Sequence, residues 1–279
     1  MSYKSLLTVL TDPNLAPGLL GQATELAARL DAHLDVLCIG VDRTQTGYYY
    51  AGASALVLQE TITRASREAE ELEAFARKEL GKTDIRWGCD HTVAPIADLG
   101  RHVAGHARYS DLVVLPQPYG EERGAELESV VEGALFEGRT PVLVMPEGAS
   151  LATLPSRIAL AWNESAEALV AVRAALPFIA GAERVNVVVI DPPTHGPNRS
   201  DPGGLLSQYI TRHGARVEVD VLAKSLPRVS DVLLRHATDT DTQMIVMGAY
   251  GHSRFREAIL GGATRNMLEQ SKLPVFMAH

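Results

Sequence analysis

Short apolar runs alternate with segments of helical period along the whole chain. The runs at 5–12, 33–38, 111–116 and 140–145 have the length and the branched side chains of buried strands. Between them, segments such as 23–30 repeat apolar residues at helical spacing, which predicts helices that bury one face. Strands that alternate with helices favour right-handed crossovers and a mostly parallel sheet covered on both faces. The pattern therefore predicts an α/β fold.

The same order of segments occurs twice, which indicates an internal repeat. Residues 111–116 match 243–248, and the later run 140–145 matches 273–278. The stretch 146–155 lies between the copies and contains the glycine and prolines typical of a linker. We therefore expect two domains, which span residues 1–148 and 154–279.

Composition narrows the classes of function. The 279 residues suit two domains, and 46% hydrophobic with 22% charged residues is typical of globular protein. Apolar runs are far shorter than the roughly 20 residues of a membrane span, and no signal peptide is evident at the N-terminus. A net charge of −8 argues against a broad surface for nucleic acid or anionic membrane. Cys38 and Cys89 are the two cysteines, and both fit buried free thiols, so we expect a cytoplasmic protein. We expect neither nucleic acid nor a membrane as a partner.

A glycine-rich stretch of the second copy carries the strongest indication of chemistry. Gly248 and Gly251 follow the apolar run 244–247, and nine residues later Gly261 and Gly262 precede a predicted helix. Glycines let backbone N–H groups approach an anion, and a helix start adds unpaired N–H groups and a positive dipole end. The stretch therefore suits phosphate, and so a nucleotide. The alternative is that these glycines serve only a tight turn and close packing of a helix on the sheet.

This stretch resembles the signature of the universal stress protein (UspA-type) superfamily, which is Gly, two residues, Gly, nine residues, Gly and then Ser or Thr. Gly248, Gly251 and Gly261 match it, whereas Gly262 stands where the family usually has a hydroxyl. The resemblance covers essentially the whole chain. It implies two tandem open sheets related by a pseudo-two-fold axis, each with five parallel strands in the order 3-2-1-4-5 and helices on both faces.

The resemblance also implies which residues of the second copy would line an ATP site. Asn163 stands where the family commonly has an aspartate that contacts the nucleoside, and Met247 would lie against the base. Thr264 either replaces the missing hydroxyl in part or caps and packs its helix. The implied site consists of Ala161, Asn163, Val189, Ile190, Met247, Gly248, Gly251, Gly261, Gly262, Ala263 and Thr264.

The residues between the two glycine pairs leave alternatives open. Arg254 and Arg256 would either reach a triphosphate or stay solvated. His252 is read as a surface or hydrogen-bonded histidine rather than an acid, base or ligand. The histidines of the chain lack metal-ligand spacing, so we predict no metal site.

The first copy departs from the motif at each glycine. Pro116 and Tyr119 replace Gly248 and Gly251, and we expect Glu128 and Ser129 where the second copy has its second glycine pair. Proline removes an N–H, and glutamate places negative charge where phosphate would lie. The first domain is therefore predicted not to bind ATP.

The function that the resemblance implies is a non-enzymatic stress-response protein, with a nucleotide sensor in the second domain. The chain has no GxxxxGK[ST], HExxH or CxxC motif, and nothing marks a nucleophile beside a base. Single-domain members of the family pair through their last strand, so residues 141–144 and 274–277 would meet inside this chain, and a homodimer of the chain is a further expectation. The alternatives are slow ATP hydrolysis or phosphate transfer, and the binding of a small molecule other than a nucleotide.

Overall fold

The computed structural model describes residues 2–43, 55–121, 123–192, 200–249 and 262–279. The chain divides into two compact units, Tyr3–Thr140 and Pro141–His279, the second of which is grouped with the N-terminal residues. None of the described helices is long and apolar enough to cross a membrane.

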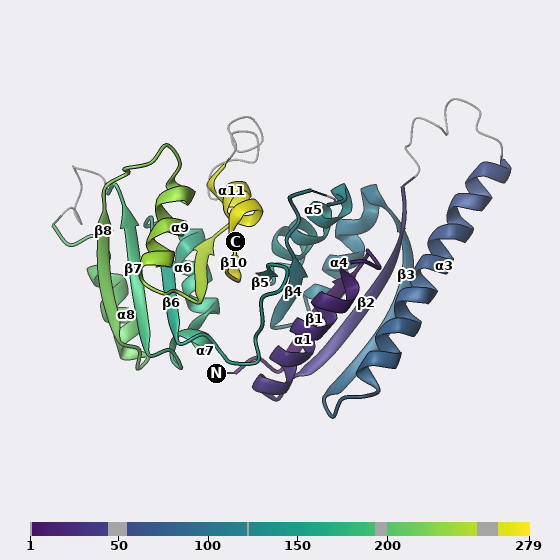
Figure 1. The fold of residues 1–279 in the computed structure, drawn as a ribbon, viewed down its shortest axis with the longest axis horizontal. Helices are drawn as coiled ribbons and strands as arrows, with labels where there is room; N and C mark the ends of the chain where they lie inside the picture. The colour runs from purple at the N-terminus through teal and green to yellow at the C-terminus, as the bar shows by residue number, and fades with distance from the viewer. Residues whose placement is uncertain (1, 44–54, 122, 193–199, 250–261) are drawn as a thin grey trace. The chain divides into compact units, whose positions relative to one another are not determined.

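The first unit is a parallel sheet with the strand order β3-β2-β1-β4. Every residue of β1 from Leu6 to Leu10 is buried, which means that both faces of the sheet are covered. Its elements, shown from purple to teal in Figure 1, are β1 (Ser5–Leu10), α1 (Ala16–Leu30), β2 (His33–Asp42), α3 (Ala55–Leu80), β3 (Arg86–Pro95), η1 (Ile96–Asp98), α4 (Leu99–Ala107), β4 (Leu112–Pro116), α5 (Ala125–Glu132) and η2 (Gly133–Glu137).

The second unit has the strand order β5-β10-β9-β6-β7-β8, and only the β5–β10 pair is antiparallel. Its elements run from teal to yellow in Figure 1. They are β5 (Val142–Met145), β6 (Arg157–Ala161), α6 (Ala166–Ala174), α7 (Leu176–Ile179), β7 (Arg184–Ile190), α8 (Gly204–Arg212), β8 (Val217–Leu222), α9 (Val229–Asp239), β9 (Met244–Gly248), α11 (Ala263–Gln270) and β10 (Val275–Ala278).

The predicted α/β class with a mostly parallel sheet is confirmed. In the second unit, β8-β7-β6-β9-β10 is the expected order 3-2-1-4-5, and the first unit shows the expected order 3-2-1-4. The fifth expected strand of the first copy, β5, falls in the second compact unit. The five-plus-five division and the domain limits 1–148 and 154–279 stay predictions.

The expected meeting of the two last strands is also confirmed. β5 and β10 pair antiparallel, with Leu143 opposite Phe276. Phe276 is fully buried, and its ring meets that of Phe178 edge to face with the centroids 6.1 Å apart. β5 therefore pairs along the edge of β10, and the side chains of both strands are buried. The apolar edge of β10 is covered in this way.

Replacement of Phe276 by alanine should destabilise the second unit by about 3–5 kcal/mol, since it removes a buried aromatic side chain and leaves a cavity. Urea unfolding followed by circular dichroism measures the change. Leu205→Ala is the control, because 72% of that leucine is exposed and its loss should cost little. Equal effects of both variants would contradict the central place of Phe276 in this core.

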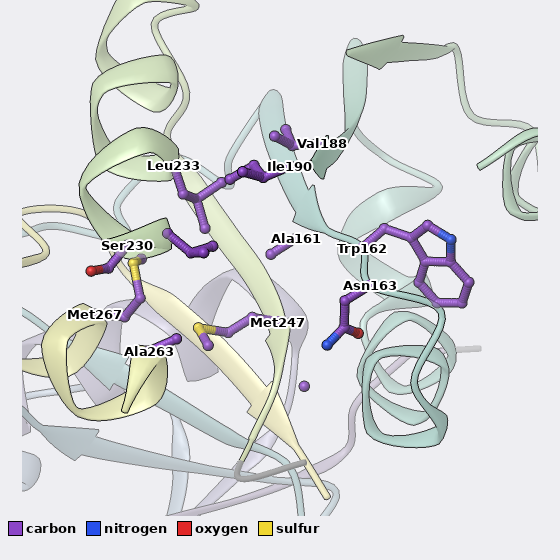
Figure 2. Close-up of a pocket in the computed structure, with 12 residues that line it drawn as sticks. Ala161, Trp162, Asn163, Val188, Ile190, Ser230, Leu233, Met247, Ala263 and Met267 are labelled. Atoms are coloured by element: carbon purple, nitrogen blue, oxygen red, sulfur yellow. The ribbon is translucent and has the colours of Figure 1, made fainter. Parts of the chain in front are cut away.

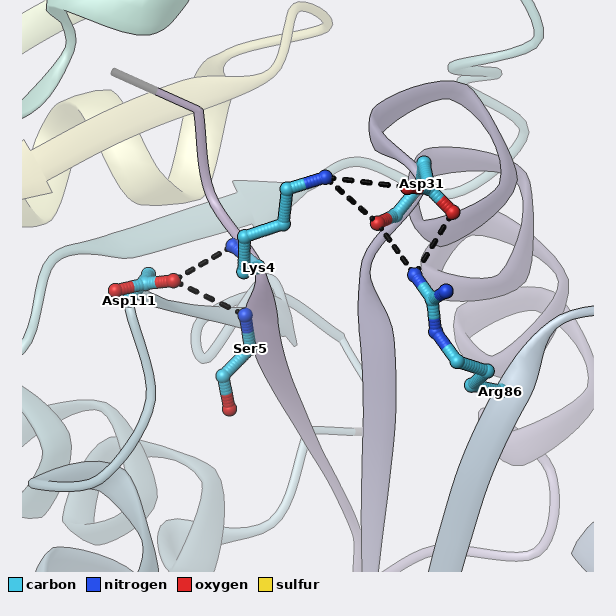
Figure 3. Close-up of polar contacts among 5 residues, drawn as sticks. All are labelled: Lys4, Ser5, Asp31, Arg86 and Asp111. Atoms are coloured by element: carbon cyan, nitrogen blue, oxygen red, sulfur yellow. Dashed lines mark hydrogen bonds and ion pairs between the residues drawn. The ribbon is translucent and has the colours of Figure 1, made fainter.

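A belt of polar contacts ties the amino ends of the first unit's strands together (Figure 3). The Asp111 carboxylate accepts hydrogen bonds from the backbone N–H of Lys4, at 2.7 Å, and of Ser5, at 3.0 Å. Asp31 follows α1 in the left-handed conformation, with φ 49°. Its carboxylate binds Nζ of Lys4 and Nη2 of Arg86, at 3.2 and 2.8 Å. The hydrogen bond from Lys4 and the charge of Arg86 hold the pKa of Asp31 below its ordinary range.

The lowered pKa of Asp31 predicts a sign for the pH dependence of stability. The Asp31 contribution is present above the unfolded-state pKa, near 3.8, and is lost as the pH falls through the lower folded-state value. The wild type should therefore exceed Asp31→Asn in unfolding free energy at pH 7, and the gap should close in acid. Urea unfolding across pH 2 to 7 tests this, with Asp84→Asn, at an exposed site, as the control. A gap that persists in acid would count against the ion pairs.

Candidate functional site

A cleft lies beyond the carboxyl ends of three adjacent parallel strands of the second unit. β6 lies between β7 and β9, so the chain leaves β6 toward one side and later returns on the other. Such a reversal of strand order is where open α/β sheets bind ligands, because the connections diverge there. The cavity has a volume of about 120 Å³, which suits one part of a ligand rather than a whole drug-sized molecule.

The walls of the cleft are mostly apolar (Figure 2). Met247 comes from β9, Met267 and Ala263 from α11, and Leu233 from α9, and they surround the same space. Among the residues that the structure describes, none that lines the cleft carries a charged side chain. The full set is Ala161, Trp162, Asn163, Val188, Ile190, Val229, Ser230, Leu233, Met247, Gly248, Ala263 and Met267.

Asn163 supplies one polar group of the cleft. The turn after β6 passes through Glu164, whose φ is 62°, to Ser165, and Ser165 caps α6 by accepting from the N–H of Ala168. The Asn163 side-chain oxygen accepts from the N–H of Ser165 at 3.2 Å. Because its oxygen is used in this way, the amide nitrogen, drawn on the Met247 side in Figure 2, is the group left to donate to a ligand.

Ser230 supplies the second polar group, from the first turn of α9. Its side chain is buried, with 1% of the residue exposed, and its hydroxyl has no hydrogen-bond partner in the described structure. A buried hydroxyl without a partner costs free energy, which a ligand acceptor would recover. The N-cap residue of α9 is Arg228, whose side chain makes no capping hydrogen bond.

The start of α11 borders the same cleft. Gly262 is its N-cap and offers no side-chain cap, and Ala263 at the next position lines the cavity. Thr264 is buried at the second helical position and is not among the lining residues. The positive end of this helix therefore borders the cleft.

The structure brings together six of the eleven residues expected in the site. Ala161, Asn163, Ile190, Met247, Gly248 and Ala263 all line the cleft. Val189 does not: its neighbours Val188 and Ile190 do, since side chains of a strand alternate between faces. Gly262 and Thr264 lie at the start of α11, whereas Gly251 and Gly261 are outside the described residues, as are His252, Arg254 and Arg256.

Six lining residues were absent from the sequence prediction. Val188 could have been found from Ile190 by the period of two along β7. The α9 residues Val229, Ser230 and Leu233 carry no motif, and only the placement of the helix after β8 brings them to the cleft. Trp162 and Met267 complete the set.

Gly248 is required by close packing at the end of β9. A Cβ built on it would lie 2.5 Å from the backbone N of Ala168 and 2.7 Å from the backbone C of Glu167. The first turn of α6 therefore approaches the end of β9 so closely that only glycine fits. This supports the structural alternative for Gly248, while the residue still borders the cleft.

One expectation about the first unit is wrong. Glu128 and Ser129 lie inside α5 and do not correspond to Gly262, which precedes α11. The N-cap of α5 is Gly124, as Gly262 is the N-cap of α11. The connection from Pro116 to α5 is shorter than the one from β9 to α11, so counting residues from the strand misaligned the helices.

In the first unit, the carboxylate of Glu126 lies beside Gly124, the N-cap of α5. A Cβ built on Gly124 would lie 2.2 Å from Oε2 of Glu126, so the carboxylate rests on the start of α5. The Glu126 side chain is 7% exposed, and Nη2 of Arg43 donates to its Oε1 at 2.7 Å. Burial opposes the charge on Arg43, but its hydrogen bonds to Glu126 and Glu68 raise its pKa. The Glu126 carboxylate thus lies beside Gly124 and is paired with Arg43. The predicted lack of nucleotide binding in the first domain stays a prediction.

The open parallel sheet defines the class: an α/β protein with a cleft at a reversal of strand order. Residues 155–279 match the model of the Universal stress protein family. The second unit is therefore similar to that family.

Individual relatives agree with this assignment. Universal stress protein Slr1230 of Synechocystis sp. (strain ATCC 27184 / PCC 6803 / Kazusa) is 25% identical over 157 residues, which are 54% of this chain. The chain spans about half the length of that curated relative, 50%.

Solved structures share the fold over nearly the whole chain. A universal stress protein from Archaeoglobus fulgidus DSM 4304 superposes with a TM-score of 0.73 at 17% identity, covering 98% of this chain and 96% of its own. A putative universal stress protein from Pseudomonas aeruginosa UCBPP-PA14 gives 0.61 at 13% identity, covering 99% and 93%. At these identities the likeness shows the fold.

Replacement of Gly248 by alanine should destabilise the chain by about 1–3 kcal/mol, because the added methyl group meets fixed backbone of α6. Gly181→Ala is the control in the same unit, since a Cβ there would lie 3.8 Å from the backbone oxygen of Phe178. Urea unfolding of both variants measures the difference. A Gly248→Ala protein as stable as the control would show that α6 is not packed so closely on β9.

Proposed function

We propose that this protein is a stress-response protein of the universal stress type whose second unit binds an adenine nucleotide without turning it over. The observation that carries the proposal is the cleft at the reversal of strand order, which joins apolar walls to two separate polar groups. The proposed setting is the cytoplasm, in keeping with the free thiols of Cys38 and Cys89.

The chemistry of the cleft suits the uncharged part of a nucleotide. Met247, Met267 and Leu233 offer flexible apolar surface to a flat base, and thioethers adapt well to aromatic rings. The Asn163 amide nitrogen can donate to a ring nitrogen or to a ribose oxygen. A base or its ribose would thus satisfy a donor that lines the cleft.

Phosphate binding would fall to the start of α11 and to the segment that precedes it. The uncapped N-terminus of the helix favours negative charge. Gly251, Gly261, Arg254 and Arg256 belong to the proposal on sequence grounds, as backbone and side-chain donors. The departure from a hydroxyl at Gly262 predicts weaker phosphate binding than the motif of the family implies.

Binding is proposed over hydrolysis because the described residues that line the cleft offer no group to activate water. Within the described part of the chain they include neither a carboxylate nor a histidine, and Asn163 stands where the resemblance implies an aspartate. General base catalysis needs such a group within hydrogen-bond reach of the attacking water. The uncharged walls favour a second candidate, which is the binding of an apolar small molecule in place of a nucleotide.

Calorimetric titration of the full chain with ATP, and separately with adenosine, tests the proposal. We expect both ligands to bind the wild type. Gly251→Val should weaken the binding of ATP more than the binding of adenosine, because valine would crowd the backbone near the phosphates. If neither ligand binds the wild type, the nucleotide proposal is wrong and the small-molecule alternative gains. Release of phosphate by the wild type, reduced in Gly251→Val, would instead indicate an enzyme.

A second variant tests the position of the site. Ala263→Leu should fill the cleft at the start of α11 and weaken binding of adenosine by about tenfold or more, which corresponds to about 1.4 kcal/mol. Val170→Leu, at a residue of α6 that is 41% exposed, is the matched control and should bind as the wild type does. Unchanged affinity in Ala263→Leu would place the ligand elsewhere.

A further inference from the structure

Two buried sulfur atoms face each other inside the first unit, away from the end of the sheet where Glu126 lies. Cys38 on β2 and Cys89 on β3 have their Sγ atoms 4.0 Å apart. Both residues are buried and both thiols are free, with 0% and 5% of each residue exposed. They are the only cysteines of the chain.

The strand register shows that these cysteines are diagonal neighbours. Cys89 lies opposite Val36, and Cys38 lies opposite His91. Diagonal neighbours on adjacent strands have Cα atoms about 7–8 Å apart, beyond the roughly 6.8 Å that a disulfide spans. Closing the sulfurs to about 2.05 Å would therefore require β3 to slide along β2. Ten consecutive residue pairs hold that register, so the pair is poorly placed for a disulfide.

The separation of the sulfurs matches a different bridge. A metal–thiolate bond is about 2.3 Å long, so one ion can join sulfurs up to about 4.6 Å apart. The observed 4.0 Å lies within that span and needs no movement of either strand. Two thiolates with no further ligand suit a soft cation that accepts low coordination, of which Cu(I) is the type in cells.

The neighbouring side chains exclude the commoner structural metals. Zinc in structural sites takes four ligands, and among the residues that the structure describes no group of three or more His, Cys, Asp or Glu is placed to hold a metal ion. His91 is engaged with Glu73, at 2.5 Å from Nδ1 to Oε2. We propose that Cys38 and Cys89 form a two-thiolate site for a soft monovalent cation of the Cu(I) class.

Binding of the ion balances without a redox partner. Both S–H bonds lose a proton to solvent and two Cu–S bonds form without change of oxidation state, which leaves one negative charge. Charged groups of both signs lie nearby: Nη2 of Arg77 donates to the carbonyl oxygen of Cys89 at 2.5 Å, and Glu73 binds the same guanidinium.

The second unit shows that the fold does not need thiols at these places. Leu6 of β1 pairs with the first residue of β4, and Ile158 of β6 pairs with the first residue of β9. Leu6 and Ile158 are therefore equivalent positions, from which the two sheets can be aligned. Following that alignment across each sheet, Val189 matches Cys38 and Val219 matches Cys89. Valine at both sites therefore gives a variant that keeps an apolar, branched side chain on each strand.

Anaerobic titration of the full reduced chain against a coloured Cu(I) chelator tests the site. The wild type should withdraw one Cu(I) ion per chain from the chelator. Cys38→Val and Cys89→Val should each lose this uptake, and the double variant should show none. Circular dichroism and urea unfolding of the double variant establish that it is folded, so that loss of uptake reports on the thiolates alone.

Two outcomes would overturn the proposal. One is uptake of Cu(I) by the wild type no greater than by the folded double variant. The other is a wild-type chain that takes up no Cu(I) and, under a mild thiol oxidant, loses two hydrogens by mass spectrometry, because the pair would then be a disulfide couple. Neither outcome bears on nucleotide binding, which is measured separately in the second unit.

Discussion

The reversal of strand order at β6 is the constraint on which the second unit's chemistry depends. Parallel strands end at one edge of the sheet, and the connections that leave β6 and β9 there run to opposite sides. The first turn of α6 packs directly on the end of β9, and Gly248 makes that approach sterically allowed. Beyond these strand ends lies a small, mostly apolar space lined by residues of β6, β7, β9, α9 and α11 and of the turn after β6.

The two units share this architecture but use its edges differently. In the first, the carboxylate of Glu126 lies beside the N-cap glycine of α5 and is paired with Arg43. In the second, the start of α11 borders a cleft whose described lining residues are uncharged. The sheets differ too, since the thiols of Cys38 and Cys89 correspond to valines in the second unit.

The sequence predicted the fold well because its signals are periodic and local. The apolar runs and the segments of helical period between them predicted the α/β class, whereas the order β8-β7-β6-β9-β10 was expected from the family resemblance. The expected contact of residues 141–144 with 274–277 came from the resemblance, and the register of Leu143 with Phe276 bears it out.

The site was only partly predictable, for physical reasons. Val189 was expected where Val188 lies, since a run of identical side chains does not reveal which face each takes. Ser230 and Leu233 reach the cleft through the packing of α9, which no motif marks. Glu128 was misplaced because connections of different length precede α5 and α11. The thiol pair depends on a register between strands that are far apart in the chain.

The grouping of β5 with the second unit bears on how the chain can be divided. A fragment limited to residues 155–279, the extent of the family match, would lack β5 and expose the backbone edge of β10. An uncovered apolar strand edge recruits other strands. Such a fragment would be expected to self-associate, so that a dimer observed for it would reflect the missing strand rather than the assembly of the intact protein.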